Sequence, residues 1–436
     1  MKTLNYLFLF LLIGSSFTSN AKDKKAISDT KTWNKSFDVN SNARFNLSSR
    51  ESEVNITTWN ENRIEIKVTL TVEAFEQEEI DKLFEAFEPS ITGNANEVTV
   101  TNPTCVQNLI VTPNRMRLKI NNEVIKVKNY HFQFDVKMPA TNNLNLKNRF
   151  GEVELGNHKG EVDLELYECD INGEIINSKK TIASLKFSDG SLGSSKNMVL
   201  NTYESELKLG ETGLLNLNAK FSKVQFLKVT DAEVNAYESE LNLGRTNAVT
   251  IKQSFGKLKI AEAKTINLTS YELDFEAVSV GNFILPSSKF SKIVCGFAGK
   301  IVVGEAYENR MTFGEIKSLQ MDAKFSNVDV GKVAESISAT GYELRLLVTD
   351  VSPGFNKLSF NGKFSNIHFK LSGSPAYNLN ASLIYGNIEF SNEKLQDLKV
   401  DKKGNRVNVS GKTKGYGGAT TISVSGYETD VTLSYN

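Results

Sequence analysis

The chain is poor in the residues that build metal centres and disulfide frameworks, and neither charge is in excess. Its 436 residues include 3 His, 3 Cys and 2 Trp, with 51 Lys+Arg against 51 Asp+Glu. No two of His131, His158 and His368 share the spacing of metal ligands, so each is interpreted as an ordinary surface residue on a strand. A chain without a basic field is not expected to bind nucleic acid.

Sequence motifs of the common catalytic sites are missing as well. There is no phosphate-cradling glycine loop, no serine in a strained elbow and no Cys/His pair. The Gly-rich, Asp-bearing nonapeptides of calcium-binding solenoids are also missing, and Ser188-Asp189-Gly190 is interpreted as a turn. We therefore expect a non-enzymatic protein without catalytic residues, cofactor or metal.

Long hydrophobic runs are confined to the start of the chain. Residues 1–21 predict a secretory signal peptide, with Lys2, an apolar run from Leu7 to Ile13, and Ser19-Asn20-Ala21 as the cleavage site. That run is too short to span a bilayer, and no later stretch is apolar enough for a membrane helix. The mature chain is expected to have no transmembrane segment and to be exported, to the periplasm or the cell surface.

Residues 22–140 predict an N-terminal β region with one short helix. Alternating apolar and polar residues, rich in Val, Ile and Thr, indicate strands through most of this region. The helix is predicted over residues 76–87, because Ile80, Leu83, Phe84 and Phe87 fall on one face, and Pro89 ends it. Its other face is acidic and is interpreted as solvated rather than as a metal site.

An aromatic residue then returns about every 17 residues, and Phe alternates with Tyr. These landmarks are Phe150, Tyr167, Phe187, Tyr203, Phe221, Tyr237, Phe255, Tyr271, Phe290, Tyr307, Phe325, Tyr342, Phe364 and Tyr385. Such a period is typical of a repeat array, which we place at residues 141–400. No proline occurs between residues 140 and 285, as expected for backbone that pairs with neighbours on both sides.

Each unit contains two short strand patterns and cannot bury an apolar face alone, so the units must stack. We predict an all-β fold: a parallel β-solenoid or β-helix, expected to be right-handed, with one unit of about 17 residues per turn. A turn of two units would have a perimeter of about 110 Å at ~3.3 Å per residue, too wide for side chains to fill.

The residues after each aromatic landmark also alternate. Tyr is followed by Glu, whereas Phe is followed by Ser or Gly and then, in several units, by Lys223, Lys257 or Lys292. Alternation would separate like charges along the stack and interleave Lys, which is a structural explanation. The functional alternative is a ligand-facing ladder formed by Tyr203, Glu204, Tyr237, Glu238, Tyr271, Glu272, Tyr307, Glu308, Tyr342 and Glu343.

The three cysteines are an odd number for an oxidising compartment, so at least one is unpaired. Cys169 and Cys295 lie seven landmarks apart, which at ~4.8 Å per stacked strand is roughly 34 Å and far beyond disulfide reach. Together with Cys105 they are interpreted as small buried hydrophobic residues.

Residues 401–436 are predicted to be a C-terminal capping repeat. Lys402-Lys403-Gly404-Asn405 indicates a hairpin turn, and Gly411 to Gly418 a flexible segment. Tyr427-Glu428 begins a last copy of the Tyr unit, which we expect to cover the open edge of the stack.

Several segments together carry a family resemblance. They are the signal peptide, Val54–Ile66, the acidic helix, Val136–Ala140, Asn148–Val153 and the Phe/Tyr units. On these segments the chain resembles a family of proposed adhesins built of β-strand repeats, of unknown function and common in Bacteroidota envelopes. The resemblance implies a right-handed β-helix-like body, export, and a role in adhesion or envelope stress. It transfers no functional residues.

The leading hypothesis is an exported, non-enzymatic adhesin or cell-envelope interaction module, whose partner is an unknown envelope protein or glycan. One alternative is a carbohydrate-binding or polysaccharide-active β-helix that uses the Tyr-Glu side. Another is a periplasmic scaffold or sensor partner. Fold alone does not choose among them, but the short, uniform turns between Phe187 and Tyr342 argue against the long loops of a polysaccharide-cleaving groove.

Overall fold

The computed structural model describes residues 25–102, 106–112, 115–120, 122–371, 376–415 and 420–435. The predicted signal peptide, Cys105 and residues 416–418 lie outside the described residues. Of the segment predicted to be flexible, residues 411–413 form the end of a strand instead, because they pair with neighbouring strands. What is described is almost entirely strand, with one α-helix and a short 3-10 helix, η1 (Asn392–Lys394). The predicted all-β class is therefore confirmed.

The contacts divide the chain into two compact units. Of the described residues, the smaller unit comprises those in the ranges 25–31, 70–88 and 106–131. It contains the helix α1 (Gln77–Ala86) and an antiparallel sheet of β7 (Val106–Thr112), β8 (Arg115–Ile120) and β9 (Glu123–Val127). Residues of β1 (Ile27–Asp38), β4 (Arg63–Ala74) and β10 (Asn129–Pro139) are divided between the two units.

The helix forms where its apolar spacing predicts, within one residue of each expected end. Ile80, Leu83 and Phe84 are buried, and Glu76 and Phe87 flank the helix as its caps. Glu78 forms an i,i+4 pair with Lys82 at 2.7 Å on the solvated face. The acidic face is thus largely exposed, as expected.

The larger unit is the stacked array with the strands that precede it. These first strands are β2 (Arg44–Arg50), β3 (Glu53–Trp59), β5 (Ser90–Gly93) and β6 (Glu97–Thr101). The array continues with β11 (Asn143–Leu155), β12 (Glu161–Lys186), β13 (Asp189–Tyr203), β14 (Glu206–Lys220), β15 (Lys223–Asn242), β16 (Arg245–Lys289), β17 (Lys292–Tyr307), β18 (Arg310–Lys324), β19 (Asn327–Tyr342), β20 (Arg345–Val351), β21 (Lys357–Lys363), β22 (Asn366–Lys370), β23 (Tyr377–Ile384), β24 (Ile388–Glu389), β25 (Leu395–Lys403), β26 (Arg406–Thr413), β27 (Thr420–Tyr427) and β28 (Asp430–Ser434).

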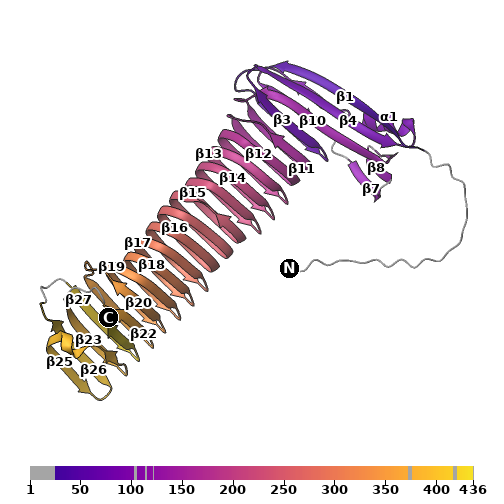
Figure 1. Cartoon of the computed structure of the whole chain (residues 1–436). Helices are drawn as coiled ribbons and strands as arrows, with labels where there is room; N and C mark the ends of the chain where they lie inside the picture. The colour runs from indigo at the N-terminus through magenta and orange to yellow at the C-terminus, as the bar shows by residue number, and fades with distance from the viewer. Residues whose placement is uncertain are drawn as a thin grey trace, which may run out of the picture. The chain divides into compact units, whose positions relative to one another are not determined.

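Successive turns of the array pair in parallel, and between β13 and β18 the partner residues are 17 or 18 residues apart. In the pairing of β14 with β15, Glu206 lies opposite Lys223 and Lys220 lies opposite Tyr237. Both pairs are one 17-residue unit apart, so each unit makes one turn, as predicted, and β13 to β18 stack in chain order (Figure 1). Alternate side chains, such as Leu215 and Leu217, point inward and are buried.

The last rungs of the stack do not follow chain order. β27 pairs in parallel with β21 on one side and with β23 on the other, and β28 lies likewise between β22 and β24. The final copy of the Tyr unit is therefore an internal rung. The expectation that this copy covers the open edge is wrong, because the antiparallel hairpin β25–β26 follows β23 instead.

One corner of the stack is held by a column of buried serines. The Ser222 hydroxyl donates to the Lys220 carbonyl at 2.8 Å and accepts from the Ser205 N–H at 3.3 Å. The Ser188 N–H donates in the same way to the Ser205 hydroxyl at 3.1 Å. Each hydroxyl thereby satisfies a buried N–H on the preceding rung that the bend removes from the strand ladder.

Replacing Ser222 with Ala should lower the free energy of unfolding by about 1–3 kcal/mol, because the Ser205 N–H is left buried without a partner. Chemical denaturation followed by circular dichroism measures this change. Ser338→Ala, on the exposed face of β19, is the control and should change the denaturation midpoint little. Equal effects of the two substitutions would contradict the assigned role of the serine column.

Candidate functional site

The predicted Tyr-Glu and Phe residues meet at the same corner, in two adjacent columns. Tyr203 lies opposite Lys186 on the preceding rung and Lys220 on the next. One residue further along the chain, Phe187, Glu204 and Phe221 follow each other from rung to rung. On these rungs, one column therefore alternates Lys and Tyr, and the adjacent column alternates Phe and Glu. Phe and Tyr are offset by one residue, and it is Glu that takes the same position as Phe.

The column that contains Phe and Glu has left-handed backbone. From Phe150 to Phe364 every member has φ between 44° and 65°, and Glu428 and Tyr385 continue the series. A non-glycine residue in this region costs of order 1 kcal/mol and persists only where surrounding contacts enforce it. This conformation turns the chain sharply at each rung and makes the corners short and uniform.

The aromatic rings form a continuous zigzag up the corner. Each ring contacts the next edge-to-face, with centroids 5.2–5.8 Å apart and planes at 66–83°. We call this surface the aromatic ladder, and its rings are Phe150, Tyr167, Phe187, Tyr203, Phe221, Tyr237, Phe255, Tyr271, Phe290, Tyr307, Phe325, Tyr342, Phe364, Tyr427 and Tyr385. The guanidinium of Arg149 lies 4.7 Å from the Tyr167 ring centroid at its first end.

The end of the aromatic ladder keeps the alternation in space rather than in sequence order. Tyr427 packs between Phe364 and Tyr385. It is followed by Glu428, like the other tyrosines that occupy the Tyr position of the ladder. Tyr385 itself has φ 57° and is followed by Gly386, so it occupies a Phe-type position. The dipeptides Tyr385-Gly386 and Tyr427-Glu428 were the sequence signal for this order.

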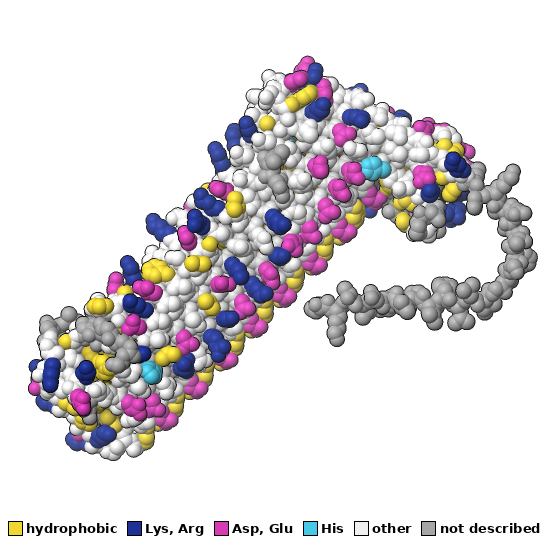
Figure 2. Space-filling view, in the orientation of Figure 1, with side chains coloured by type: hydrophobic (Ala, Val, Ile, Leu, Met, Phe, Trp, Pro, Cys, Tyr) yellow, Lys and Arg dark blue, Asp and Glu magenta, His cyan; other side chains and the backbone are white. Residues whose placement is uncertain are grey.

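The rings are partly exposed and alternate with carboxylates. Phe221 is 41% exposed and Tyr237 39% exposed, so both residues remain accessible to solvent. Figure 2 shows hydrophobic and acidic side chains alternating in a line along this side of the stack. The ladder therefore presents the same pair of groups at every second turn, about 9.6 Å apart.

Each of several tyrosines interacts with the glutamate that follows it. The Glu238 carboxylate accepts a hydrogen bond from the Tyr237 phenol and raises its pKa. The glutamates that follow Tyr203 and Tyr307 raise the pKa of these phenols in the same way. For Tyr271, desolvation is the larger cause of the raised pKa, and Glu272 adds to it.

The lysines predicted to lie between these glutamates do not do so. Lys223 pairs with Glu206 at 2.6 Å, and Lys257 pairs with Glu240 at 3.4 Å, both on the strands after the corner. A Phe-type residue separates successive ladder glutamates instead. At about 9.6 Å two exposed carboxylates repel by about 0.4 kcal/mol in water, about half the repulsion at one strand spacing.

A shallow depression of about 690 Å³ lies beside the central part of the ladder. Glu272, Phe290 and Glu308 of the ladder column line it, together with Lys257 and Arg310. Both signs of charge and an aromatic ring therefore meet there. The structure brings the predicted ladder residues onto one corner, and their function remains a prediction.

The cysteines and histidines are placed as separate side chains. Cys169 takes a position in the serine column, and Cys295, on β17, faces the core of the stack. Both thiols are free and buried. His158 is buried rather than on the surface, with Nδ1 3.1 Å from the Gly156 carbonyl oxygen, and burial lowers its pKa. His368 Nε2 lies 3.0 Å from the Ser434 hydroxyl.

Neutralising Glu238 should lower the pKa of Tyr237 towards its ordinary value. A carboxylate that accepts the phenolic hydrogen bond stabilises the neutral phenol, so Glu238→Gln removes the cause of the raised pKa. NMR titration of ring-labelled tyrosine measures the change. Glu233→Gln, another exposed carboxylate on β15, should leave Tyr237 unchanged; a Tyr237 pKa that ignores Glu238→Gln would contradict the contact.

Burial raises the pKa of the Cys169 and Cys295 thiols to about 11. In a Cys105→Ser variant, neither remaining thiol should react with a disulfide reagent at pH 8 at the rate of an exposed cysteine. A shift of about two pKa units alone reduces the thiolate fraction roughly 100-fold. Absorbance of the released thiolate before and after denaturation measures this; equal rates in the two states would exclude burial.

Comparisons with known proteins provide little beyond this geometry. No family model matches the chain, and no curated protein matches it. A solved structure of a proposed cell adhesion protein from Clostridium sporogenes aligns at 12% identity, over 94% of this chain and 100% of that chain, with a TM-score of 0.16. At that TM-score the similarity carries no structural argument. Within the described residues, no helix is both long and apolar enough to cross a membrane.

Proposed function

We propose that this protein is an exported, non-enzymatic interaction module of the cell envelope, of the adhesin type, and that the aromatic ladder is its contact surface. The proposal includes membership of the β-strand-repeat adhesin family of Bacteroidota envelopes that the sequence resembles. The observation that carries it is the repetition of one ring and one carboxylate at the same corner of successive pairs of turns.

Repetition favours binding to an extended or repeating partner. A single exposed ring or carboxylate contributes little affinity, since exposed ion pairs are worth about 0–1 kcal/mol. A regular array can engage many weak contacts at once, and the second and later contacts then form at high effective concentration. The uninterrupted parallel pairing fixes the spacing of these groups, because no long loop separates β13 from β18.

Binding of the mature chain, residues 22–436, to isolated envelopes of the source organism tests the proposal. The triple variant Glu238→Gln, Glu272→Gln, Glu308→Gln should weaken binding roughly tenfold, from about 0.5 kcal/mol per lost contact. Glu233→Gln, Glu305→Gln, Glu315→Gln removes three exposed carboxylates elsewhere on the stack and should bind like the parent.

Equal binding by the two triple variants would contradict a role for the aromatic ladder.

The same mature chain is incubated with a panel of polysaccharides and assayed for reducing ends. Turnover of any of them would contradict the non-enzymatic part of the proposal and favour the polysaccharide-active alternative. Fractionation of cells that make the full chain tests export, with cleavage expected after Ala21.

A further inference from the structure

A second surface lies at the C-terminal end of the stack and uses none of the ladder residues. Four neighbouring strands, β21, β27, β23 and β26, direct two columns of side chains outward. The first column is Ser359, Ser423, Asn380 and Ser410; the second is Asn361, Ser425, Ser382 and Asn408. Every member of both columns is a neutral hydroxyl or amide.

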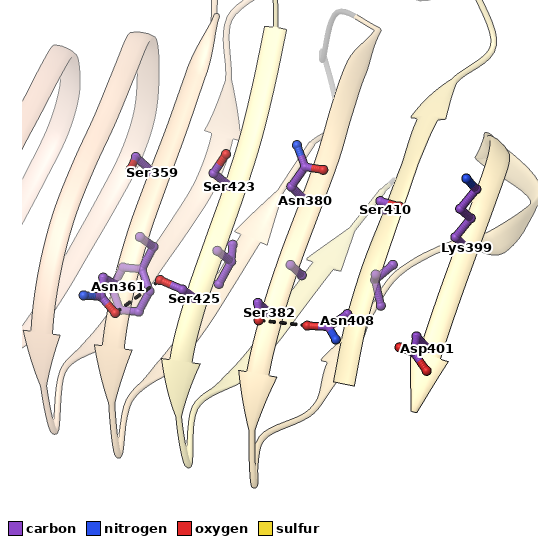
Figure 3. A pocket seen from close by; sticks show the side chains of 14 residues that line it. Ser359, Asn361, Asn380, Ser382, Lys399, Asp401, Asn408, Ser410, Ser423 and Ser425 are labelled. Carbon is purple, nitrogen blue, oxygen red and sulfur yellow. Dashed lines mark hydrogen bonds between the residues drawn. The ribbon is translucent and has the colours of Figure 1, made fainter. Parts of the chain in front are cut away.

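The two columns line a hollow of about 480 Å³, whose end is bounded by Lys399 and Asp401 on β25. Figure 3 shows the labelled polar side chains along β21, β27, β23, β26 and β25, which pair with one another in this order. We call this surface the polar trough. The neutral character continues one rung earlier, at Ser338 and Thr340, and the first charged residue in these columns beyond it is Asp322.

Hydrogen bonds within the polar trough leave donors and acceptors free towards the hollow. Ser382 Oγ donates to Asn408 Oδ1 at 2.8 Å, and Ser425 Oγ donates to Asn361 Oδ1 at 3.2 Å. These pairs fix the side chains, while the amide groups of the two asparagines keep their N–H donors and the hydroxyls keep their acceptor lone pairs. The surface is thus preorganised, with donors beside acceptors on rigid strands.

This chemistry matches a sugar better than other ligand classes. Each sugar hydroxyl both donates and accepts, as do the serine hydroxyls and asparagine amides that face it. Nucleic acid and anionic lipid surfaces require a basic field, and protein interfaces usually have an aromatic or aliphatic centre. The trough has no basic field, because the single positive charge of Lys399 is balanced by Asp401. Four apolar residues also line it, Phe360, Ala381, Val409 and Val424, but they are buried, whereas the polar side chains of the two columns face outward.

We propose that the polar trough binds a short neutral oligosaccharide, with the sugar chain lying across β21, β27, β23 and β26. A neutral lining complements a neutral ligand, because desolvating unpaired charges on either partner would oppose binding. The trough exists only because β27 enters the stack between β21 and β23, which places Ser423 and Ser425 between the column residues of those two strands.

The test uses the mature chain and titration calorimetry with four neutral hexasaccharides: cellohexaose, laminarihexaose, maltohexaose and mannohexaose. At least one should bind. Asn380→Ala and Asn408→Ala should each weaken that binding about 2–10-fold, the effect of one lost hydrogen bond. Asn218→Ala, an exposed asparagine on β14 outside the trough, is the matched control and should not change the affinity.

A hexamer of galacturonic acid is the charged comparison and should bind more weakly than the best neutral sugar. The proposal is overturned if no neutral hexasaccharide binds at millimolar concentration, if the charged hexamer binds best, or if the Asn380→Ala, Asn408→Ala double variant binds like the parent. Should that variant unfold, as judged by its circular dichroism melt, Ser423→Arg blocks the trough with a single substitution of a half-buried residue. Envelope binding through the aromatic ladder is measured separately, so either proposal can fail alone.

Discussion

The structure depends on one residue per turn whose backbone is left-handed, and this residue recurs at the same corner on successive rungs. That residue lets parallel pairing continue on both sides of the bend. Its strain, of order 1 kcal/mol or more, is opposed by edge-to-face ring contacts worth about 0.5–1.5 kcal/mol each and by the serine hydroxyl that satisfies the freed N–H. The ladder and the serine column are therefore two sides of the same bend.

The offset between Tyr and Phe explains why two residue types alternate. If every rung had an aromatic residue at the left-handed position, the rings would lie directly above one another at one strand spacing. Alternation between the columns of Tyr203 and Phe221 gives the edge-to-face geometry that aromatic quadrupoles favour. The glutamate takes the position that the offset leaves empty, which separates like charges as well.

The periodicity was sufficient to predict strands, parallel stacking and one unit per turn, because buried side chains must recur once per rung. It could not set the register at the corner, since aligning Phe with Tyr by type ignores the one-residue offset. The sequence did contain a signal for this offset. Ser205 and Ser239 follow Glu just as Ser188 and Ser222 follow Phe, so aligning the serines places Glu and Phe at the same position. The place of β27 depends on pairing between distant segments, which a local pattern does not contain. The polar trough was missed for the same reason.

The out-of-order rung also affects the order in which the stack can form during synthesis. Rungs up to β22 can add one after another, each on a partner already made. Among the described pairings, β23 and β24 reach the stack only through β27 and β28, the last strands of the chain. The two final rungs must therefore assemble together, after a loop has been closed between distant segments at an entropic cost. A chain that ends before Thr420 has an open edge at β21 and β22, so these rungs gain their second parallel neighbours only once β27 and β28 have been made.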